Sequence, residues 1–293
     1  MLILLPPSET KATGGTGGAL DLTTLSFPGL TEVRADILAD LVALDVDEAL
    51  TVLGISETLR GEAEANRALR EAPTMPALGR YTGVLYDALD AATLTDADPA
   101  ARSRLAVGSA LFGVVRADDP IPHYRLSGST KLPRRTAASG AGSGTGSGTG
   151  SGTGSGAVPT MKKRWGRTIT DALTATPDGA GDGVIVDLRS GSYQGLGKLP
   201  VQDAASGTGA VTVRVESVRP DGTRKVVSHF NKHYKGVLAR VLATAGSDAD
   251  DARTAMDVAD LARGAGFTVE VNAPTTTASG KVTPPKDSLT LVV

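Results

Sequence analysis

Residues 1–7 read MLILLPP, an unbroken apolar run closed by two prolines. A short continuous run of this kind is typical of a buried β-strand. Pro6 must end the strand, because proline has no N–H to donate to a neighbouring strand. Val184-Ile-Val-Asp-Leu188 predicts a second buried strand, and strands are also expected at residues 267–271 and 289–293. Each half of the chain is short of strands alone, which favours one sheet built from both halves.

The segments between these strands show other periodicities. Apolar side chains at helical spacing predict helices over about residues 30–44, 234–242 and 250–263. Residues 105–115 predict a strand, a turn and the start of an apolar helix. Residues 211–215 alternate valine with polar side chains, as in a half-exposed strand. The sequence therefore predicts a mixed α/β protein built around one sizeable core.

The composition excludes several classes of site. The chain of 293 residues has no cysteine and a net charge of −2. The absence of cysteine excludes disulfides, a thiolate nucleophile, cysteine-bound zinc and a cysteine-held iron–sulfur cluster. A dedicated nucleic-acid binder usually carries a clear basic excess, so any such site here must be a local patch.

The sequence also bears on localisation. Residues 1–11 have no basic segment and only a very short apolar run, so they do not resemble a signal peptide. No stretch approaches the ~18 apolar residues that a membrane-spanning helix needs. We therefore expect a cytoplasmic protein with no membrane partner.

A low-complexity segment lies near the middle of the chain. Residues 137–160 are dominated by Gly, Ser and Thr. Such a composition cannot bury apolar area, so we expect a disordered insert there.

A candidate helix-hairpin-helix element lies at about residues 40–70. Leu53-Gly54-Ile55 stands between two helical stretches, and Gly54 permits a sharp turn. Arg60 and Arg67 lie on the second helix, where each could meet a phosphate. An ordinary turn between two helices is the competing interpretation. From residue 32 to residue 71 we count ten acidic and four basic side chains, a balance of −6 that repels a phosphate backbone.

Cationic side chains gather at the predicted start of a later helix. Lys232 and Lys235 are three residues apart, and helix N-termini with cationic side chains favour anions. A solvated charged face is the competing interpretation. His229 and His233 are four residues apart but lack a third ligand, so we expect no metal site and no cofactor.

Three further candidate side chains lie in a proline-rich segment. Arg116, Tyr124 and Arg125 belong to a stretch anchored by apolar residues, and such rigid loops can hold functional groups on a scaffold. A structural pairing of arginine with Asp118 or Asp119 is the competing interpretation.

Several of these segments together resemble the YaaA peroxide stress family, in the family's order and over nearly the whole chain. The block from Leu111-Phe-Gly to Tyr124-Arg125 is the most specific part of the resemblance. The matching pieces are Met1-Leu-Ile-Leu-Leu-Pro-Pro-Ser-Glu-Thr-Lys11, Tyr81-Thr-Gly-Val-Leu-Tyr86, Ser109-Ala-Leu-Phe-Gly-Val-Val-Arg116, Asp119-Pro-Ile-Pro-His-Tyr-Arg-Leu126, Trp165-Gly166, Val184 to Tyr193, and Ser228-His-Phe-Asn-Lys-His-Tyr-Lys-Gly236.

The resemblance implies one intertwined α/β domain over residues 1–293, with a mixed central sheet and a helix-hairpin-helix element. It also implies a positively charged cleft, binding of double-stranded DNA, and a cytoplasmic role in oxidative stress that limits free iron and the damage it causes. No reaction comes with it, so catalytic residues stay unassigned. The positions that match the family and are expected to line a shared DNA- or anion-binding cleft are Ser8, Glu9, Lys11, Ser109, Arg116, Tyr124, Arg125, Lys232 and Lys235.

Three functional hypotheses remain open. The first is a DNA-binding stress protein. The second is an enzyme acting on a phosphorylated or nucleotide-like small molecule, with Lys11, Arg125 and Lys232 converging on one cleft to hold the anion. The third is an iron-handling protein, which the scarcity of histidine and the absence of cysteine weaken. An enclosed pocket favours the small molecule, whereas an open groove favours nucleic acid.

Overall fold

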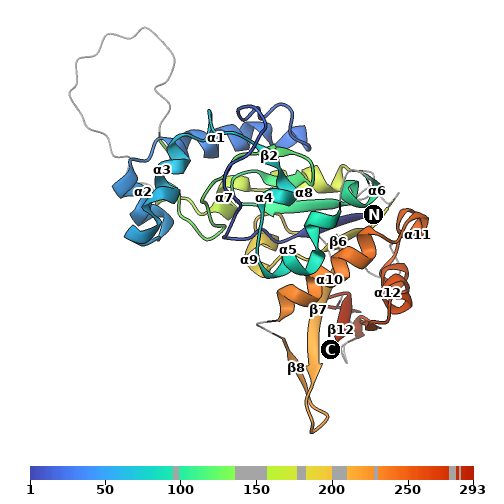
Figure 1. The fold of residues 1–293 in the computed structure, drawn as a ribbon. Coiled ribbons are helices and arrows are strands. Elements are labelled where there is room, and N and C mark those ends of the chain that lie inside the picture. Colours follow the sequence, from blue (N-terminus) through green and yellow to red (C-terminus); the bar gives the residue numbers. More distant parts are fainter. Residues whose placement is uncertain are drawn as a thin grey trace, which may run out of the picture.

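A mixed β-sheet lies between two layers of helices (Figure 1). The structure is a computed structural model, and it describes residues 1–94, 99–135, 157–176, 183–199, 210–227, 230–276, 282–283 and 285–293. Within these residues the main sheet has eight strands in the order β4-β3-β1-β6-β7-β12-β9, with β8 paired to β7.

The middle of the sheet is parallel and its edges are antiparallel. Strand β1 lies between β3 and β6 and runs parallel to both, and β6, β7 and β12 continue the parallel part. Strands β4, β8 and β9 pair antiparallel with β3, β7 and β12. The expected mixed α/β fold with a mixed central sheet is thus confirmed. The strands are β1 (Leu2–Leu5), β3 (Leu105–Ser109), β4 (Gly113–Arg116), β6 (Ile185–Asp187), β7 (Ala210–Val218), β8 (Arg224–Val226), β9 (Thr268–Val271) and β12 (Leu289–Val292), and two small pairs are formed by β2 (Met75–Pro76) with β5 (Pro120–Ile121) and by β10 (Thr275–Thr276) with β11 (Val282–Thr283).

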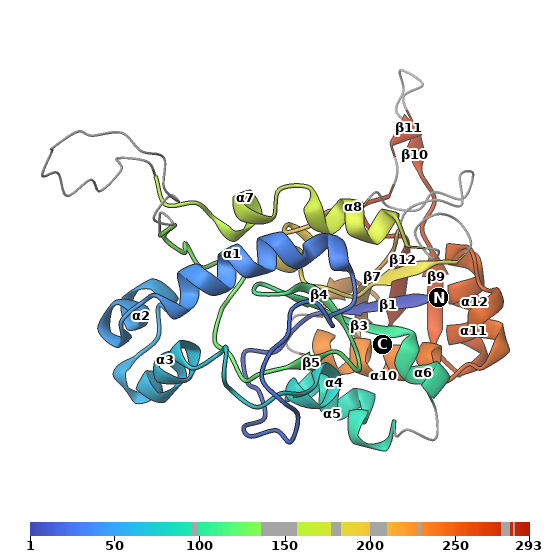
Figure 2. The same cartoon turned by 90° about the horizontal axis from the view of Figure 1, so that it is seen from above.

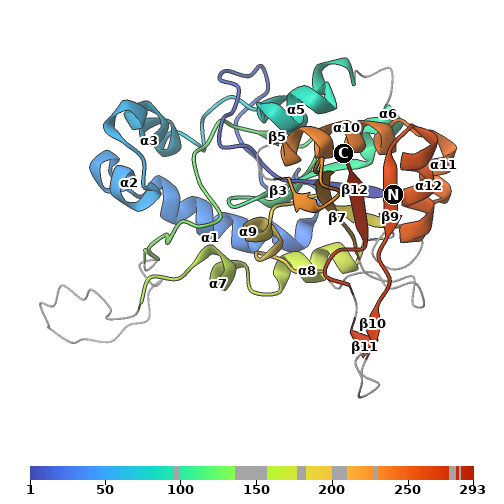
Figure 3. The same ribbon diagram turned by 90° about the horizontal axis from the view of Figure 1, so that it is seen from below.

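The helices cover both faces of this sheet. Figures 2 and 3 show α1, α7 and α8 along one face and α5 and α10 along the other. Helices α2 and α3 project at one end of the molecule, and α11 and α12 lie at the opposite end. The helices are α1 (Thr31–Val42), α2 (Val46–Leu53), α3 (Arg60–Arg67), α4 (Ala77–Arg80), α5 (Val84–Leu89), α6 (Pro99–Ser103), α7 (Met161–Trp165), α8 (Thr168–Thr174), α9 (Gly191–Gln194), α10 (Asn231–Ala243), α11 (Ser247–Asp251) and α12 (Ala255–Gly264), with short 3-10 turns at Pro28–Leu30, Glu57–Leu59 and Ala91–Thr93.

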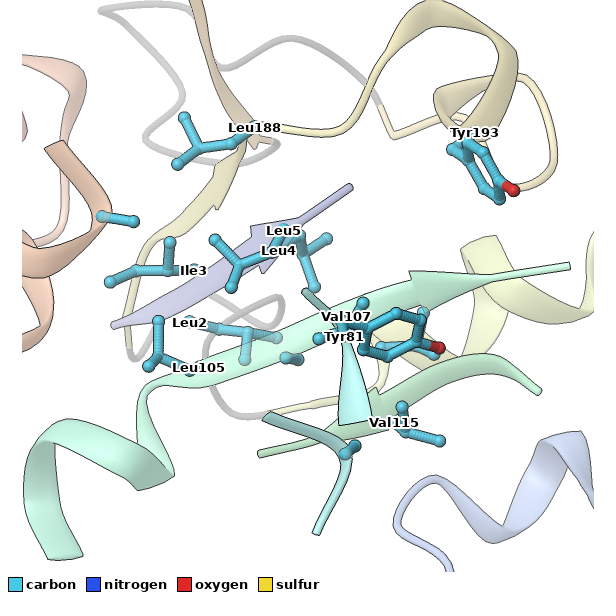
Figure 4. Packing of buried hydrophobic residues seen from close by; sticks show 14 of the residues in the cluster. Leu2, Ile3, Leu4, Leu5, Tyr81, Leu105, Val107, Val115, Leu188 and Tyr193 are labelled. Atoms are coloured by element: carbon cyan, nitrogen blue, oxygen red, sulfur yellow. The ribbon is translucent and has the colours of Figure 1, made fainter. Parts of the chain in front are cut away.

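The apolar run at residues 2–5 forms the centre of the core. All four side chains are 0% exposed, because β1 is flanked by strands on both edges and by helices on both faces. Figure 4 shows Leu2 to Leu5 packed among Leu105, Val107 and Leu188. Full burial of one such side chain contributes about 1.5–3 kcal/mol to stability. The first strand predicted from the sequence is therefore confirmed.

Two local expectations are wrong. Residues 110–116 do not begin a helix: they turn and return as β4, with Gly113 at a φ of 71°. The buried Arg34 holds this turn by donating to the carbonyls of Phe112 and Val114. Strand β7 is also mostly buried rather than half-exposed, since it lies inside the sheet between β6 and β12.

Some expectations fall on other parts of the chain. The Gly/Ser/Thr-rich insert expected at residues 137–160 falls largely on residues 136–156, which lie outside the described residues, as does His229. Within the described part, Thr160 pairs with Lys131 in an isolated β-bridge and caps α7. None of the described helices is long and apolar enough to cross a membrane.

Candidate functional site

The carboxyl ends of β1, β3 and β6 meet at one edge of the sheet, since the three strands are parallel. In the strand order, β3 follows β1 along the chain and lies on one side of the β1–β6 pair, whereas β7 follows β6 and lies on the other side. A crevice at such a point of divergence is where open α/β sheets usually bind ligands. Three segments reach this edge directly: residues 6–12 after β1, Ser109 at the end of β3, and Asp187 to Arg189 at the end of β6.

A buried chain of hydroxyl groups lies at this edge. The Tyr124 phenol oxygen is 2.8 Å from that of Tyr81 and 2.7 Å from Ser109 Oγ. Ser109 Oγ in turn accepts a hydrogen bond from the backbone N–H of Phe112 at 3.0 Å. Burial raises the pKa of both phenols above the ordinary value. Both tyrosines therefore remain protonated at neutral pH and keep a proton to donate.

Lys11 lies against these two phenol rings. A β-bridge between Lys11 and Tyr81 fixes its backbone. Its Nζ is 4.3 Å from the centre of the Tyr124 ring and 5.5 Å from that of Tyr81, and it donates to the Ser8 carbonyl at 3.0 Å. Burial lowers the pKa of Lys11 to about 8, although Glu9 nearby opposes the shift. Near neutral pH this amine is therefore deprotonated more readily than an ordinary lysine, although the protonated form still predominates.

The buried Arg80 holds the loop that carries Lys11. Its guanidinium donates to the carbonyls of Ala12 at 2.6 Å, Gly14 at 2.9 Å and Ile121 at 3.1 Å. The guanidinium thus joins the loop after Lys11 to the segment that leads to Tyr124. Such multiple hydrogen bonds to a buried charge rigidify the backbone that they join.

The segment around Tyr124 is also bonded to helix α3. Asn66 donates to the Arg125 carbonyl at 2.8 Å and accepts from the Arg125 N–H at 2.9 Å. His123 Nε2 is 2.9 Å from a Glu62 carboxylate oxygen, and Nδ1 is 3.1 Å from the Ala12 carbonyl. These contacts place α3 directly beside the loop of Lys11.

Arg125 and Lys232 approach the same loop from different elements. The Arg125 guanidinium pairs with Glu9 at 3.2 Å. Lys232, at the start of α10, lines a cavity of about 230 Å³ together with Ser8, Thr10 and Thr82. Helix α10 can lie close to α5 because Gly236 has no side chain: a Cβ there would be 2.3 Å from the Leu85 carbonyl.

A buried ion pair closes the β6 side of the edge. Arg189 donates twice to the Asp187 carboxylate, at 2.9 and 2.8 Å, and once to the Gly197 carbonyl. Lys235 donates to the Leu188 carbonyl at 3.2 Å, and burial lowers its pKa, opposed by Asp187 and Asp287.

The structure brings most of the residues expected in the cleft to this edge, with one exception. Ser8, Glu9 and Lys11 form the loop, and Ser109, Tyr124, Arg125, Lys232 and Lys235 surround it. Arg116 lies at the other end of the sheet, because β4 runs antiparallel to β3 and its last residue pairs with Ala106. There Arg116 donates to the Ser103 carbonyl and lies 5.5 Å from the Phe27 ring.

The helix pair at residues 46–67 has the turn that the sequence indicates. Gly54 ends α2 with a φ of 64°, a conformation that favours glycine. Arg60 is engaged by acidic neighbours, Glu57 at 2.6 Å and Asp47 at 2.5 Å, whereas Arg67 is exposed. Sequence reasoning missed the roles of Tyr81, Arg80 and Glu62, which only the folded chain places beside Lys11. Within the described parts of the chain, no group of three or more acidic or histidine side chains could hold a metal ion.

Comparison with known proteins establishes the family. The profile of the peroxide stress protein YaaA matches residues 1–141 and 149–265. A UPF0246 protein of Corynebacterium efficiens is 61% identical over 293 residues, which is 100% of both chains. A UPF0246 protein of Corynebacterium glutamicum strain R is 57% identical over 272 residues, 93% of this chain and 96% of the relative. One from Streptomyces coelicolor is 41% identical over 281 residues, 94% of each. The chain therefore belongs to the YaaA family of peroxide stress proteins.

Proposed function

We propose that this peroxide stress protein binds double-stranded DNA at the crevice outside β1 and β6. The observation that carries the proposal is the set of three cations around one loop. Lys11 donates to Ser8, Lys232 shares a cavity with Ser8, and Arg125 pairs with Glu9. Cations gathered at one site attract phosphate groups, and arginine presents a planar fork that matches phosphate oxygens.

The helix pair supports DNA over other polyanions. Helix α3 is joined to this loop through Asn66–Arg125 and Glu62–His123, so one ligand could contact both the helix pair and the loop. Gly54, at the end of α2, is exposed to solvent. The acidic balance around this pair repels phosphate, however, so we expect the loop cations to carry most of the attraction.

The proposal places this binding in a cytoplasmic response to peroxide. Protection of DNA against oxidative damage fits the name of the family. A role in limiting free iron, which the resemblance implies, would accompany this binding.

A second candidate function rests on the size of the cavity at Ser8. A volume of about 230 Å³ admits a phosphate with a small group attached, rather than a duplex. This observation favours an enzyme or receptor for a phosphorylated or nucleotide-like small molecule. The two candidates share the same cations, so substitution alone does not separate them.

A pair of titrations separates the two candidates. Fluorescence anisotropy would measure the affinity of the purified protein for a labelled duplex and for a labelled nucleoside monophosphate. DNA binding predicts the tighter affinity for the duplex, weakened by Arg125→Ala with Lys232→Ala. Lys163→Ala, an exposed position on α7, is the matched control and should bind as the wild type does. Tighter binding of the monophosphate, with no duplex bound above background, would reject the DNA proposal and favour the second candidate.

A further inference from the structure

The environment of Lys11 is unusual for a lysine. A buried ammonium is normally paired with a carboxylate, because desolvation of an unpaired charge is costly. Among the described residues, Lys11 Nζ has no ion-pair partner within hydrogen-bonding distance. It contacts the two phenol rings and donates to one backbone carbonyl. These contacts hold the amine in place without a carboxylate to balance its charge.

Two interactions of the backbone hold Lys11 in this position. Arg80 fixes the loop after Lys11, and the β-bridge to Tyr81 fixes the lysine backbone itself. Lys235, by comparison, also donates to a backbone carbonyl and has two carboxylates nearby, Asp187 and Asp287, as Lys11 has Glu9 and Glu62. Lys11 differs in that it lies against two phenol rings and near the guanidinium groups of Arg125 and Arg80, which add to the lowering of its pKa. These surroundings match those of a reactive amine, desolvated and next to a second cation, here Arg125.

We propose that Lys11 is a nucleophile that forms a Schiff base with an aldehyde adjoining a phosphate. Loss of a base from DNA produces such a group, because the ring-opened deoxyribose carries an aldehyde and is flanked by phosphates. A free sugar phosphate with an aldehyde has the same chemistry. The inference rests on the proposed phosphate-binding role of this cleft and names the substrate class.

The condensation balances with groups already present. The lone pair of the neutral Nζ attacks the carbonyl carbon, the C=O π bond breaks, and the oxygen takes up a proton to give a carbinolamine. The nitrogen then releases its protons as the C=N bond forms, and the hydroxyl leaves as water. The product is an imine and one water, and no oxidant or reductant is needed.

The hydroxyl chain is placed to move the protons of this step. Tyr124 adjoins the amine, and its phenol is hydrogen-bonded to both Tyr81 and Ser109. A proton donated by Tyr124 to the carbinolamine oxygen can be restored along this chain. Lys232 and Arg125, on either side of the loop, are placed to hold the adjoining phosphate.

Borohydride trapping tests the proposal, since it reduces an imine to a stable amine. The full-length protein would be mixed with a duplex that contains one abasic site, with the intact duplex, or with glyceraldehyde 3-phosphate, and then reduced. We expect a covalent adduct with the abasic duplex and none with the intact duplex. Peptide mapping by mass spectrometry should place the adduct on Lys11.

Variants show whether the adduct depends on the Lys11 amine and on the Tyr124 hydroxyl. Lys11→Arg keeps the cation beside the phenol rings, so it should fold and bind but form no adduct. Tyr124→Phe keeps the amine but removes the proton donor, so the adduct should form about tenfold or more slowly. Lys163→Met, at an exposed lysine on α7, is the matched control and should be trapped at the wild-type rate.

Each other outcome is decisive. An adduct on another lysine, or one that persists in Lys11→Arg, overturns the proposal. Trapping of glyceraldehyde 3-phosphate alone at Lys11 keeps the reactive amine and rejects DNA as the source of the aldehyde. A protein that binds the intact duplex but forms no adduct with either aldehyde overturns the Schiff base and leaves DNA binding standing. Trapping at Lys11 without binding of the intact duplex supports the Schiff base and rejects the DNA-binding proposal.

Discussion

The phenol oxygens of Tyr81 and Tyr124 lie 2.8 Å apart, in the protein interior, at the edge of the sheet where β1 and β3 end. The two residues are brought together from segments 43 positions apart in the chain. Both phenol rings contact the Lys11 amine, and the Tyr124 hydroxyl is also hydrogen-bonded to Ser109.

Tyr124→Phe should destabilise the protein measurably. The substitution removes the Tyr124 hydroxyl, so the buried Tyr81 and Ser109 hydroxyls each lose their hydrogen bond to it. Leaving buried polar groups unsatisfied costs about 1–3 kcal/mol, so the urea midpoint should fall accordingly. Tyr234→Phe, on the partly exposed face of α10, is the matched control and should unfold as the wild type does. An unchanged midpoint for Tyr124→Phe would show that the hydroxyl chain does not stabilise the fold.

Lys11 should make stability depend on pH in a defined direction. Its pKa is about 8 in the folded protein, where burial lowers it, and near the ordinary lysine value of 10.5 in the unfolded chain. Between these two values the unfolded chain binds more protons, so stability rises with pH. Relative to Lys11→Met, the wild type should therefore gain free energy of unfolding from about pH 8 to pH 10.5. Urea titrations of both proteins at several pH values measure this difference, and a constant difference would contradict the buried amine.

Leu4→Ala tests the centre of the sheet. Leu4 is 0% exposed on a strand that is paired along both edges, so the cavity left by truncation cannot collapse easily. The expected loss is about 2–5 kcal/mol in the free energy of unfolding. Leu59→Ala, at a side chain that is 38% exposed, should cost far less. Equal losses at the two positions would contradict the central place of β1.

Asn66→Ala should loosen the helix pair. Asn66 is buried and bonds both the N–H and the carbonyl of Arg125, so truncation leaves two backbone groups without these partners. We expect faster hydrogen exchange in α2 and α3, with little change in β1. Arg67→Ala, exposed on the same helix, is the comparison variant and should leave exchange unchanged. Uniform acceleration across the molecule would mean that α3 is not a separately opening unit.

Much of the fold could be predicted from the sequence because its strong patterns are local. The apolar run at residues 2–5 and the helical spacing at residues 30–44 specify their own elements. The prediction of a helix after residue 110 was wrong because the apolar side chains there pack in a tight turn between β3 and β4. A Cβ on Gly113 would lie 2.9 Å from the Trp165 ring, a contact no local pattern reveals.

The candidate site was only partly predictable for the same physical reason. Lys11, Tyr124 and Arg125 stand in distinctive motifs, and strand order brings them to one edge. Arg116 shares such a motif but lies at the other end of the sheet, since the antiparallel return of β4 reverses its direction. Arg80 and Glu62 gave no sequence signal, because their partners are the Ala12 carbonyl and His123, distant in the chain.

The salt dependence of duplex binding tests the central claim most directly. Each phosphate contact contributes about −0.9 to the slope of log affinity against log salt concentration. We predict that Arg125→Ala with Lys232→Ala makes the slope shallower by about 2, whereas Arg60→Ala with Arg67→Ala changes it by less than about 1. The reason is that Arg60 is already engaged by Asp47 and Glu57, while Lys232 is exposed at the cavity of Ser8. A slope unchanged in the loop variant, with binding abolished in the helix-pair variant, would contradict the proposal that the strand-end crevice is the DNA-binding site.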